Sequence, residues 1–287
     1  THVYRSVRVD RLNATVNSSR YNSLFVGRVE LLKKKAQVGC KQGCTFCSTG
    51  KMGKLRSLSS TEILSQFFYA IKICRLGSIP KINNVVFMGM GEPADNAEEV
   101  ITALNILTDV DLFHMSHSKV TVSTVAPSPA AFTNFKDAPC VLAWSVHAAN
   151  EKLRKQLVPT SKYPMTELRQ GLIDTLLSRP KRLRATMLEV VLISEVNDGV
   201  EAAEELAEFT QVIIDSVPGI KLMVNLIPFN DIGHPTFRKP QMDQVHTFQQ
   251  ILTDNGIFTQ VRTTRGDDES AACGQLATKK AKRKSSD

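Results

Sequence analysis

From residue 36 onward, short runs of β-branched and apolar residues alternate with longer segments in which apolar residues recur every three or four positions. The short runs predict strands and the longer segments predict helices. Strands are predicted over residues 36–40, 84–90, 119–125, 140–147, 184–193, 221–229 and 258–264, and helices over residues 60–76, 97–107, 150–157, 165–177, 199–215 and 241–255.

This alternation predicts an α/β fold in which helices cover a parallel sheet, with six or seven βα units. The connections between strands are long enough for parallel crossovers, which both a curved partial barrel and a doubly wound sheet require. Residues 1–35 differ, because polar turn residues separate short apolar stretches there, and we expect a small β extension. The pattern alone does not decide between the two sheet architectures.

Composition indicates a folded protein outside the membrane. The 287 residues are 42% hydrophobic and 22% charged, which suffices for a large core. No apolar run is long enough to cross a bilayer. Residues 1–36 carry a charge of +6 and residues 279–287 carry +4, so the remainder is near neutral. Such basic ends suit contact with a phosphate backbone, and they suit solvated tails equally well.

Three of the six cysteines, Cys40, Cys44 and Cys47, lie within eight residues directly after a predicted strand. This spacing indicates a metal site rather than disulfides, and it favours a reducing compartment. A structural zinc site would need four ligands, and no second pair of cysteines is present. Three thiolates on a [4Fe–4S] cluster would leave one iron open to a substrate or cofactor.

The Cys-x-x-x-Cys-x-Phe-Cys segment resembles the cluster motif of the radical S-adenosylmethionine (SAM) superfamily. Further segments resemble the RlmN/Cfr family of radical SAM methyltransferases, which methylate adenine carbons in RNA. They are Gln37–Cys40, 47–50, 88–93, 225–230 and, near the end of the chain, 265–276. The resemblance implies a partial (β/α)6 barrel, a [4Fe–4S] cluster and SAM. It also divides the chain into an extension at 1–35, a catalytic domain at 36–278 and a basic tail at 279–287.

The resemblance also implies roles for individual residues. Cys40, Cys44 and Cys47 would bind the cluster, and Cys273 would carry the methyl group. The positions that would hold the polar groups of SAM are Gly91, Glu92, Ser123, Ser145, Val146, His147 and Asn230. Two SAM would be consumed for each methyl group transferred.

The sequence departs from the family at two places. Family members carry another cysteine seven residues before the first cluster ligand, where this chain has Lys33. The family's N-terminal accessory domain has only residues 1–35 in its place. Cys74 and Cys140 lie in predicted apolar elements, so we expect them to be packing residues rather than substitutes for the missing thiol.

We therefore expect a methyltransferase that acts on adenine C2 of ribosomal or transfer RNA. It would be a monomer, cytoplasmic or within an organelle, and served by an electron donor such as flavodoxin or ferredoxin. Lys33 and the missing domain leave open a radical SAM enzyme with a non-RNA acceptor. A third reading is a non-catalytic iron–sulfur protein that binds RNA through its basic ends.

Overall fold

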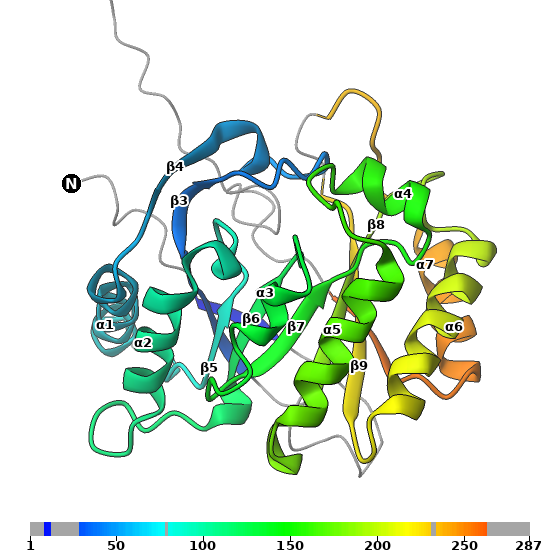
Figure 1. Ribbon diagram of the computed structural model, residues 1–287. Helices are drawn as coiled ribbons and strands as arrows, with labels where there is room; N and C mark the ends of the chain where they lie inside the picture. The colour runs from blue at the N-terminus through cyan, green and yellow to red at the C-terminus, as the bar shows by residue number, and fades with distance from the viewer. Residues whose placement is uncertain (1–8, 13–28, 78–79, 231–233, 263–287) are drawn as a thin grey trace, which may run out of the picture.

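One eight-stranded sheet, with strand order β1-β2-β5-β6-β7-β8-β9-β10, forms the centre of the computed structural model (Figure 1). The structure describes residues 9–12, 29–77, 80–230 and 234–262. The strands of this sheet are β1 (Val9–Leu12), β2 (Val29–Lys33), β5 (Asn84–Phe87), β6 (Val120–Thr124), β7 (Val141–Ser145), β8 (Ala185–Leu192), β9 (Lys221–Pro228) and β10 (Thr259–Val261).

Every pairing from β2 to β10 is parallel, and β1 is added antiparallel at the edge. The sheet curls into a half-barrel with helices on its outside (Figure 1). The prediction of a parallel α/β fold is therefore confirmed, and the curl selects the partial barrel over the doubly wound sheet. All carboxyl ends of the parallel strands meet at one edge, which is where such sheets bind ligands.

The predicted helices are confirmed with ends that differ by at most one or two residues. They are α1 (Ser60–Leu76), α2 (Ala97–Thr108), α4 (Glu151–Leu157), α5 (Met165–Ser178), α6 (Val200–Ser216) and α7 (Met242–Asp254), and the short α3 (Ala130–Thr133) was not predicted. At the start of α1 the Ser59 side chain accepts a hydrogen bond from the Glu62 N–H, and the Glu62 carboxylate accepts one from the Ser59 N–H. This capping box satisfies backbone donors that the first helical turn leaves open.

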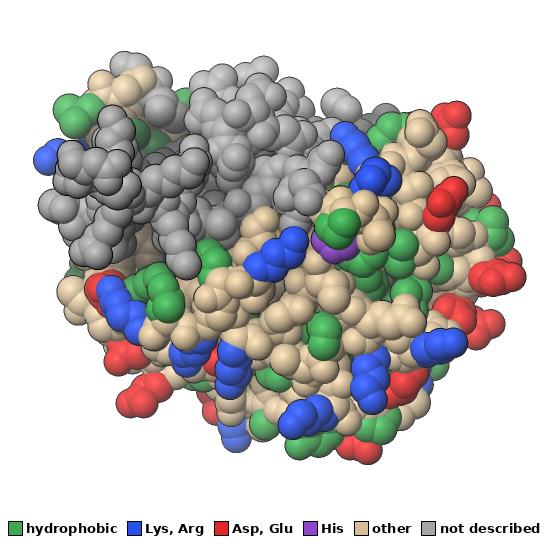
Figure 2. Space-filling view, turned by 90° about the horizontal axis from the view of Figure 1, so that it is seen from above, with side chains coloured by type: hydrophobic (Ala, Val, Ile, Leu, Met, Phe, Trp, Pro, Cys, Tyr) green, Lys and Arg blue, Asp and Glu red, His purple; other side chains and the backbone are tan. Residues whose placement is uncertain are grey.

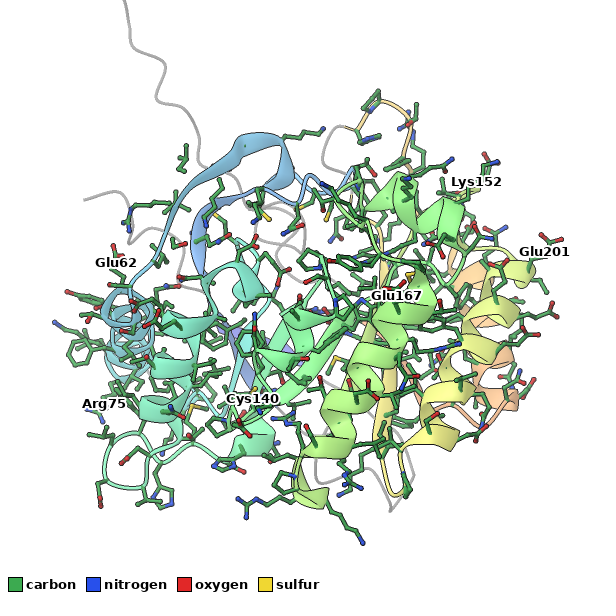
Figure 3. All side chains as sticks on the ribbon, viewed as in Figure 1. Glu62, Arg75, Cys140, Lys152, Glu167 and Glu201 are labelled. Carbon is green, nitrogen blue, oxygen red and sulfur yellow. The ribbon has the colours of Figure 1, made fainter. Side chains whose placement is uncertain are left out.

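Apolar side chains from the sheet and the helices form the core in two large clusters. One joins β5 and β6 to α1 and α2, and the other joins β7, β8 and β9 to α5, α6 and α7. Cys74 and Cys140 are buried in the first cluster, as expected for packing residues. In Figure 3, Cys140 lies inside the molecule toward the lower end of the sheet, away from β3 and β4 at the top.

The segment before the three cysteines differs from the prediction. Residues 36–40 were expected to be a strand of the parallel sheet, but β3 (Gln37–Cys40) pairs with β4 (Gly53–Ser57) in a separate antiparallel ribbon. The strand beside β5 is β2, within the stretch assigned to the extension. Gly39 permits the close pairing in this ribbon: it has a φ of +78°, and a Cβ there would lie 1.9 Å from the Gly53 carbonyl oxygen. Only glycine allows this close approach.

In the part of the chain that the structure describes, no helix has both the length and the apolar character needed to span a membrane. The predicted carrier Cys273 and the basic tail at 279–287 lie outside the described residues.

Candidate functional site

The loop that carries Cys40, Cys44 and Cys47 is fixed to the carboxyl edge of the sheet by hydrogen bonds to distant residues. The Thr45 N–H donates to the Leu157 carbonyl oxygen at 3.0 Å. The Gln42 side-chain amide donates to Asp95 Oδ2 at 2.9 Å, and the Thr160 hydroxyl donates to Gln42 Oε1 at 2.7 Å. The loop therefore has a defined position at the edge where the strands end.

Burial and neighbouring thiols disfavour the thiolate forms of Cys40 and Cys44. Burial raises the pKa of Cys40 to about 11 and raises the pKa of Cys44 further, and the nearby Cys47 thiol raises both. No three His, Cys, Asp or Glu side chains among the described residues converge as ligands of one ion. A [4Fe–4S] cluster does not need such convergence, because each thiolate binds a different iron.

The turn after β5 places Gly91 and Glu92 next to the ribbon that carries the cysteines. Gly91 has a φ of +92°, and a Cβ there would lie 2.5 Å from the Gln37 Cβ. The Glu92 N–H donates to Gln37 Oε1 at 3.1 Å, and the buried Glu92 carboxylate accepts hydrogen bonds from the N–H groups of Ala94 and Val125. Burial raises the pKa of Glu92 to about 7, against the lowering effect of these donors.

Hydroxyl groups meet where β6 and β7 end. Ser123 Oγ lies 3.1 Å from Ser145 Oγ, and it donates to Glu189 Oε2 at 3.2 Å. On the other side of Glu189, the Asn225 side-chain amide donates to Oε1 at 3.2 Å. The sequence analysis identified both serines as site residues, included Asn225 only within the segment 225–230, and missed Glu189. A single carboxylate within the otherwise uncharged stretch ATMLEVVL was the signal that could have found Glu189, because buried charges are rare unless they are paired.

Residues 145–147 turn sharply at the end of β7, and a buried arginine donates to the carbonyl groups of the first two. Arg154 donates to the carbonyl oxygens of Ser145 and Val146, both at 2.6 Å, and to that of Val125. His147 has a φ of +59°. Its Nδ1 accepts from the Val191 N–H at 3.2 Å, and burial lowers its pKa well below the usual value. The imidazole is therefore neutral, with its proton on Nε2.

Asn230 follows β9 at the same edge and is buried, so the fold brings all of the predicted SAM positions to the carboxyl ends of β5, β6, β7 and β9. The cluster loop lies at this edge as well. Cys273 is the exception among the predicted site residues, since it lies outside the described residues.

Basic side chains lie around this edge of the molecule. Figure 2 looks down on it, and many Lys and Arg side chains are visible across the described part of that face. Among them Lys51 and Arg238 are close enough to His234 to lower its pKa, after the larger effect of burial. Two positively charged side chains, Lys51 and Arg238, therefore act on His234 at this edge, and cations at this edge suit an anionic partner.

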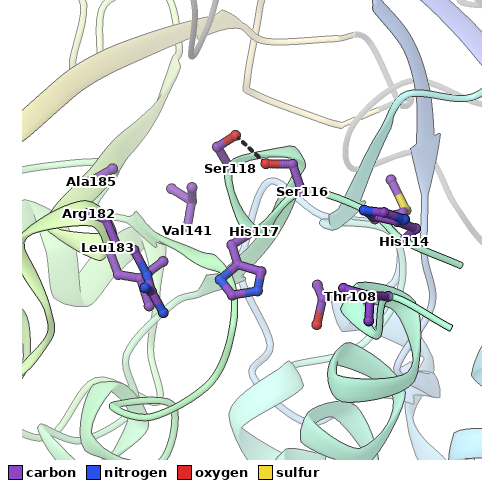
Figure 4. Close-up of a pocket in the computed structure, with 11 residues that line it drawn as sticks. Thr108, His114, Ser116, His117, Ser118, Val141, Arg182, Leu183 and Ala185 are labelled. Atoms are coloured by element: carbon purple, nitrogen blue, oxygen red, sulfur yellow. Dashed lines mark hydrogen bonds between the residues drawn. The ribbon is translucent and has the colours of Figure 1, made fainter. Parts of the chain in front are cut away.

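A pocket of about 590 Å³ opens at the opposite edge of the sheet and contains none of the predicted site residues (Figure 4). It lies where β7 and β8 begin, and His117 and Arg182 are among its polar lining residues. The cluster-loop cysteines and the Ser123–Ser145 pair therefore lie at the carboxyl edge, whereas this pocket lies at the other edge.

Comparison with known proteins shows which family the chain belongs to. The radical SAM superfamily matches residues 35–193. The chain is 41% identical over 247 residues to the dual-specificity RNA methyltransferase RlmN of Marinomonas sp., covering 84% of this chain and 64% of that protein. It is 39% identical over 267 residues to the RlmN of Alcanivorax borkumensis, covering 91% and 68%.

Among solved structures, a radical SAM methyltransferase from Sphaerobacter thermophilus matches with a TM-score of 0.77 and 36% identity, covering 85% of this chain and 69% of that one. This chain spans about two thirds of the length of the curated relatives that it matches. The superfamily implies a [4Fe–4S] cluster and SAM as cofactors, and the three-thiol loop beside buried polar groups fits both. The chain belongs to the radical SAM superfamily and, within it, to the RlmN family.

Proposed function

We propose that this chain is a radical SAM methyltransferase that methylates C2 of adenine in ribosomal or transfer RNA. One observation carries the proposal: the three-thiol loop and the buried polar residues lie at the same edge of the half-barrel, joined through Gln37 and Glu92. Family membership supports the choice of reaction, because the matched relatives are named dual-specificity RNA methyltransferases.

In this proposal Cys40, Cys44 and Cys47 hold the cluster, and the residues at the strand ends hold SAM. Gly91, Glu92, Ser123, Ser145, Val146, His147 and Asn230 are the proposed SAM-binding residues. A bound cluster with SAM supplies one-electron chemistry that removes hydrogen from unactivated carbon, which polar side chains cannot do.

The Cys273 thiolate would displace S-adenosylhomocysteine from one SAM and so take its methyl group. The radical chemistry of a second SAM would remove one hydrogen atom from this S-methyl group, giving 5′-deoxyadenosine, and the carbon would then bond to the adenine ring. Two SAM are consumed per methyl group transferred. A covalent carrier of this kind divides one difficult transfer into two steps. Because Lys33 stands where the family has its second cysteine, we propose that an external thiol attacks the Cys273 sulfur. A mixed disulfide then forms as the carbon–sulfur bond to the product breaks, and a proton completes the new methyl group.

The Lys and Arg side chains around the carboxyl edge of the sheet support RNA as the methyl acceptor. Lys51 and Arg238 carry positive charge near His234 at the edge where the reaction would occur. Lysine and arginine side chains there would contact phosphates and position the RNA without reading its sequence.

We further propose that the protein acts as a monomer in the cytoplasm or an organelle, with a flavodoxin-like or ferredoxin-like electron donor. In this proposal residues 36–278 form its catalytic unit.

The proposal is tested by incubating reduced, cluster-reconstituted protein with methyl-labelled SAM and RNA. We expect label in C2-methyladenosine and formation of 5′-deoxyadenosine. Cys273→Ala should still cleave SAM but transfer no methyl group, whereas Cys74→Ala, a change at a buried packing thiol, should retain transfer.

A second candidate acceptor, a small molecule or protein, is motivated by Lys33. It predicts that the methyl label accumulates on Cys273 and never reaches RNA. Failure to form 5′-deoxyadenosine despite a full cluster would instead indicate a non-catalytic iron–sulfur protein, and would overturn the proposal.

A further inference from the structure

Glu189 lies at the centre of a buried polar row that crosses the sheet. The strand register places Ser145 of β7, Glu189 of β8 and Asn225 of β9 side by side. Glu189 is only 4% exposed. Its Oε2 accepts from Ser123, its Oε1 accepts from Asn225, and the Arg262 guanidinium lies 3.8 Å from Oε1.

This row fixes the direction of each hydroxyl hydrogen bond. A carboxylate paired with a guanidinium can only accept, so Ser123 must give its single proton to Glu189. Ser123 then has no proton left for Ser145, although the two oxygens are 3.1 Å apart. Ser145 is therefore the donor in that pair. Both hydroxyls have used their protons within the protein, and each offers only lone pairs to a ligand.

We propose that Glu189 is a positioning residue that makes Ser123 and Ser145 hydrogen-bond acceptors toward SAM. Acceptors select the donor groups of the cofactor, which are its ammonium group and its ribose hydroxyls, and they repel its carboxylate. This inference rests on the proposed function, since it assumes that SAM binds where β6 and β7 end. It adds Glu189 to the site and gives Ser123 and Ser145 the role of hydrogen-bond acceptors, neither of which follows from the resemblance to the family's motifs.

Glu189→Gln tests the inference because it keeps the size of the side chain and removes its acceptor-only character. An amide that turns its NH₂ group toward Ser123 reverses that hydrogen bond, and one that turns it the other way opposes the donors of Asn225 and Arg262. Glu204→Gln, the same change on an exposed face of α6, is the matched control.

The readout is binding, not turnover. The affinity of the cluster-reconstituted protein for S-adenosylhomocysteine is measured by calorimetry, together with analogues that lack the amino group, the 2′-hydroxyl or the 3′-hydroxyl. In the wild type, loss of the group that faces the serines should weaken binding about 10-fold or more. Glu189→Gln should bind S-adenosylhomocysteine about 10-fold to 100-fold more weakly than the wild type does. The analogue that lacks the group facing the serines should then bind to this variant only slightly more weakly than S-adenosylhomocysteine itself.

Each outcome separates the two proposals. If the wild type does not bind S-adenosylhomocysteine, the proposed function fails. If the wild type binds it and Glu189→Gln binds the whole analogue series with unchanged affinities, the role of Glu189 is refuted while the proposed function stands. If Glu189→Gln weakens every analogue equally, Glu189 supports the fold only, which also refutes its role in setting polarity.

Discussion

The ring of Phe46, between the second and third cysteines of the loop, meets the imidazole of His147 edge-on, with ring centroids 4.6 Å apart. Phe46 belongs to the cluster loop and His147 to the turn after β7. Both pack in or against a small apolar cluster at the carboxyl edge that also includes Leu157 and Phe229. This contact joins the proposed iron–sulfur loop directly to the proposed SAM site.

Phe46→Ala should loosen that junction. Loss of a buried phenylalanine ring is expected to lower the free energy of unfolding by about 3–5 kcal/mol. Phe68→Ala is the matched control, because Phe68 is 58% exposed on α1 and its removal should change stability by at most about 0.5 kcal/mol. Urea unfolding of both variants checks this expectation. Equal effects would contradict a structural role for the Phe46–His147 contact.

Arg154→Met should destabilise the protein by about 3 kcal/mol, because three carbonyl oxygens at the ends of β6 and β7 lose their donors. Arg154→Lys should rescue only part of this loss, since one ammonium group cannot reproduce the planar fork. Arg182→Met, at an exposed arginine, serves as the control. Thermal unfolding of the three variants is the measurement, and a stable Arg154→Met protein would refute the assigned role.

Gly91→Ala should impair SAM binding and stability together. The new methyl group would press against the Gln37 side chain, which holds the Glu92 N–H, and the positive φ would add about 1–3 kcal/mol of strain. Gly199→Ala is the control: its φ is −79° and no atom lies within 4 Å of its added Cβ. If both variants bind S-adenosylhomocysteine like the wild type, the tight turn at Gly91 is not required.

The raised pKa of Glu92 predicts that the free energy of unfolding depends on pH. Burial raises its pKa from 4.5 to about 7, so the folded protein holds this proton more tightly than the unfolded chain does. The associated stabilisation is complete below pH 4.5 and disappears as the pH rises to 7, a loss of about 3 kcal/mol. Glu92→Gln should lack this slope, whatever its absolute stability. Urea unfolding across that pH range compares the two, and parallel curves would contradict the prediction.

Replacement of any one cluster cysteine should prevent stable cluster assembly. Cys44→Ala removes one of three ligands, and the described cysteines outside the loop, Cys74 and Cys140, are buried in the core. Iron and sulfide content after anaerobic reconstitution should fall for Cys40→Ala, Cys44→Ala and Cys47→Ala, but not for Cys74→Ala. Full iron content in Cys44→Ala would show that this thiol is not a ligand.

The sequence by itself determined the alternation of strands and helices, because each element repeats its apolar residues at its own period. It also determined the three-thiol loop and the polar residues that end the strands, because these lie in short local motifs. Helix ends were predictable to within one or two residues, since signals such as the Ser59–Glu62 capping box are local.

Only the tertiary structure decided which strand begins the barrel and which buried groups complete the site. The charged residues around β2 hid a strand whose place depends on pairing with β5, and the expected strand at 36–40 pairs with β4 in a separate ribbon, at a close approach that Gly39 permits. Glu189 acquires its role from neighbours 66 and 36 residues away, Ser123 and Asn225. Contacts between strands depend on how the sheet is ordered and curled, and no local pattern in the chain contains that information.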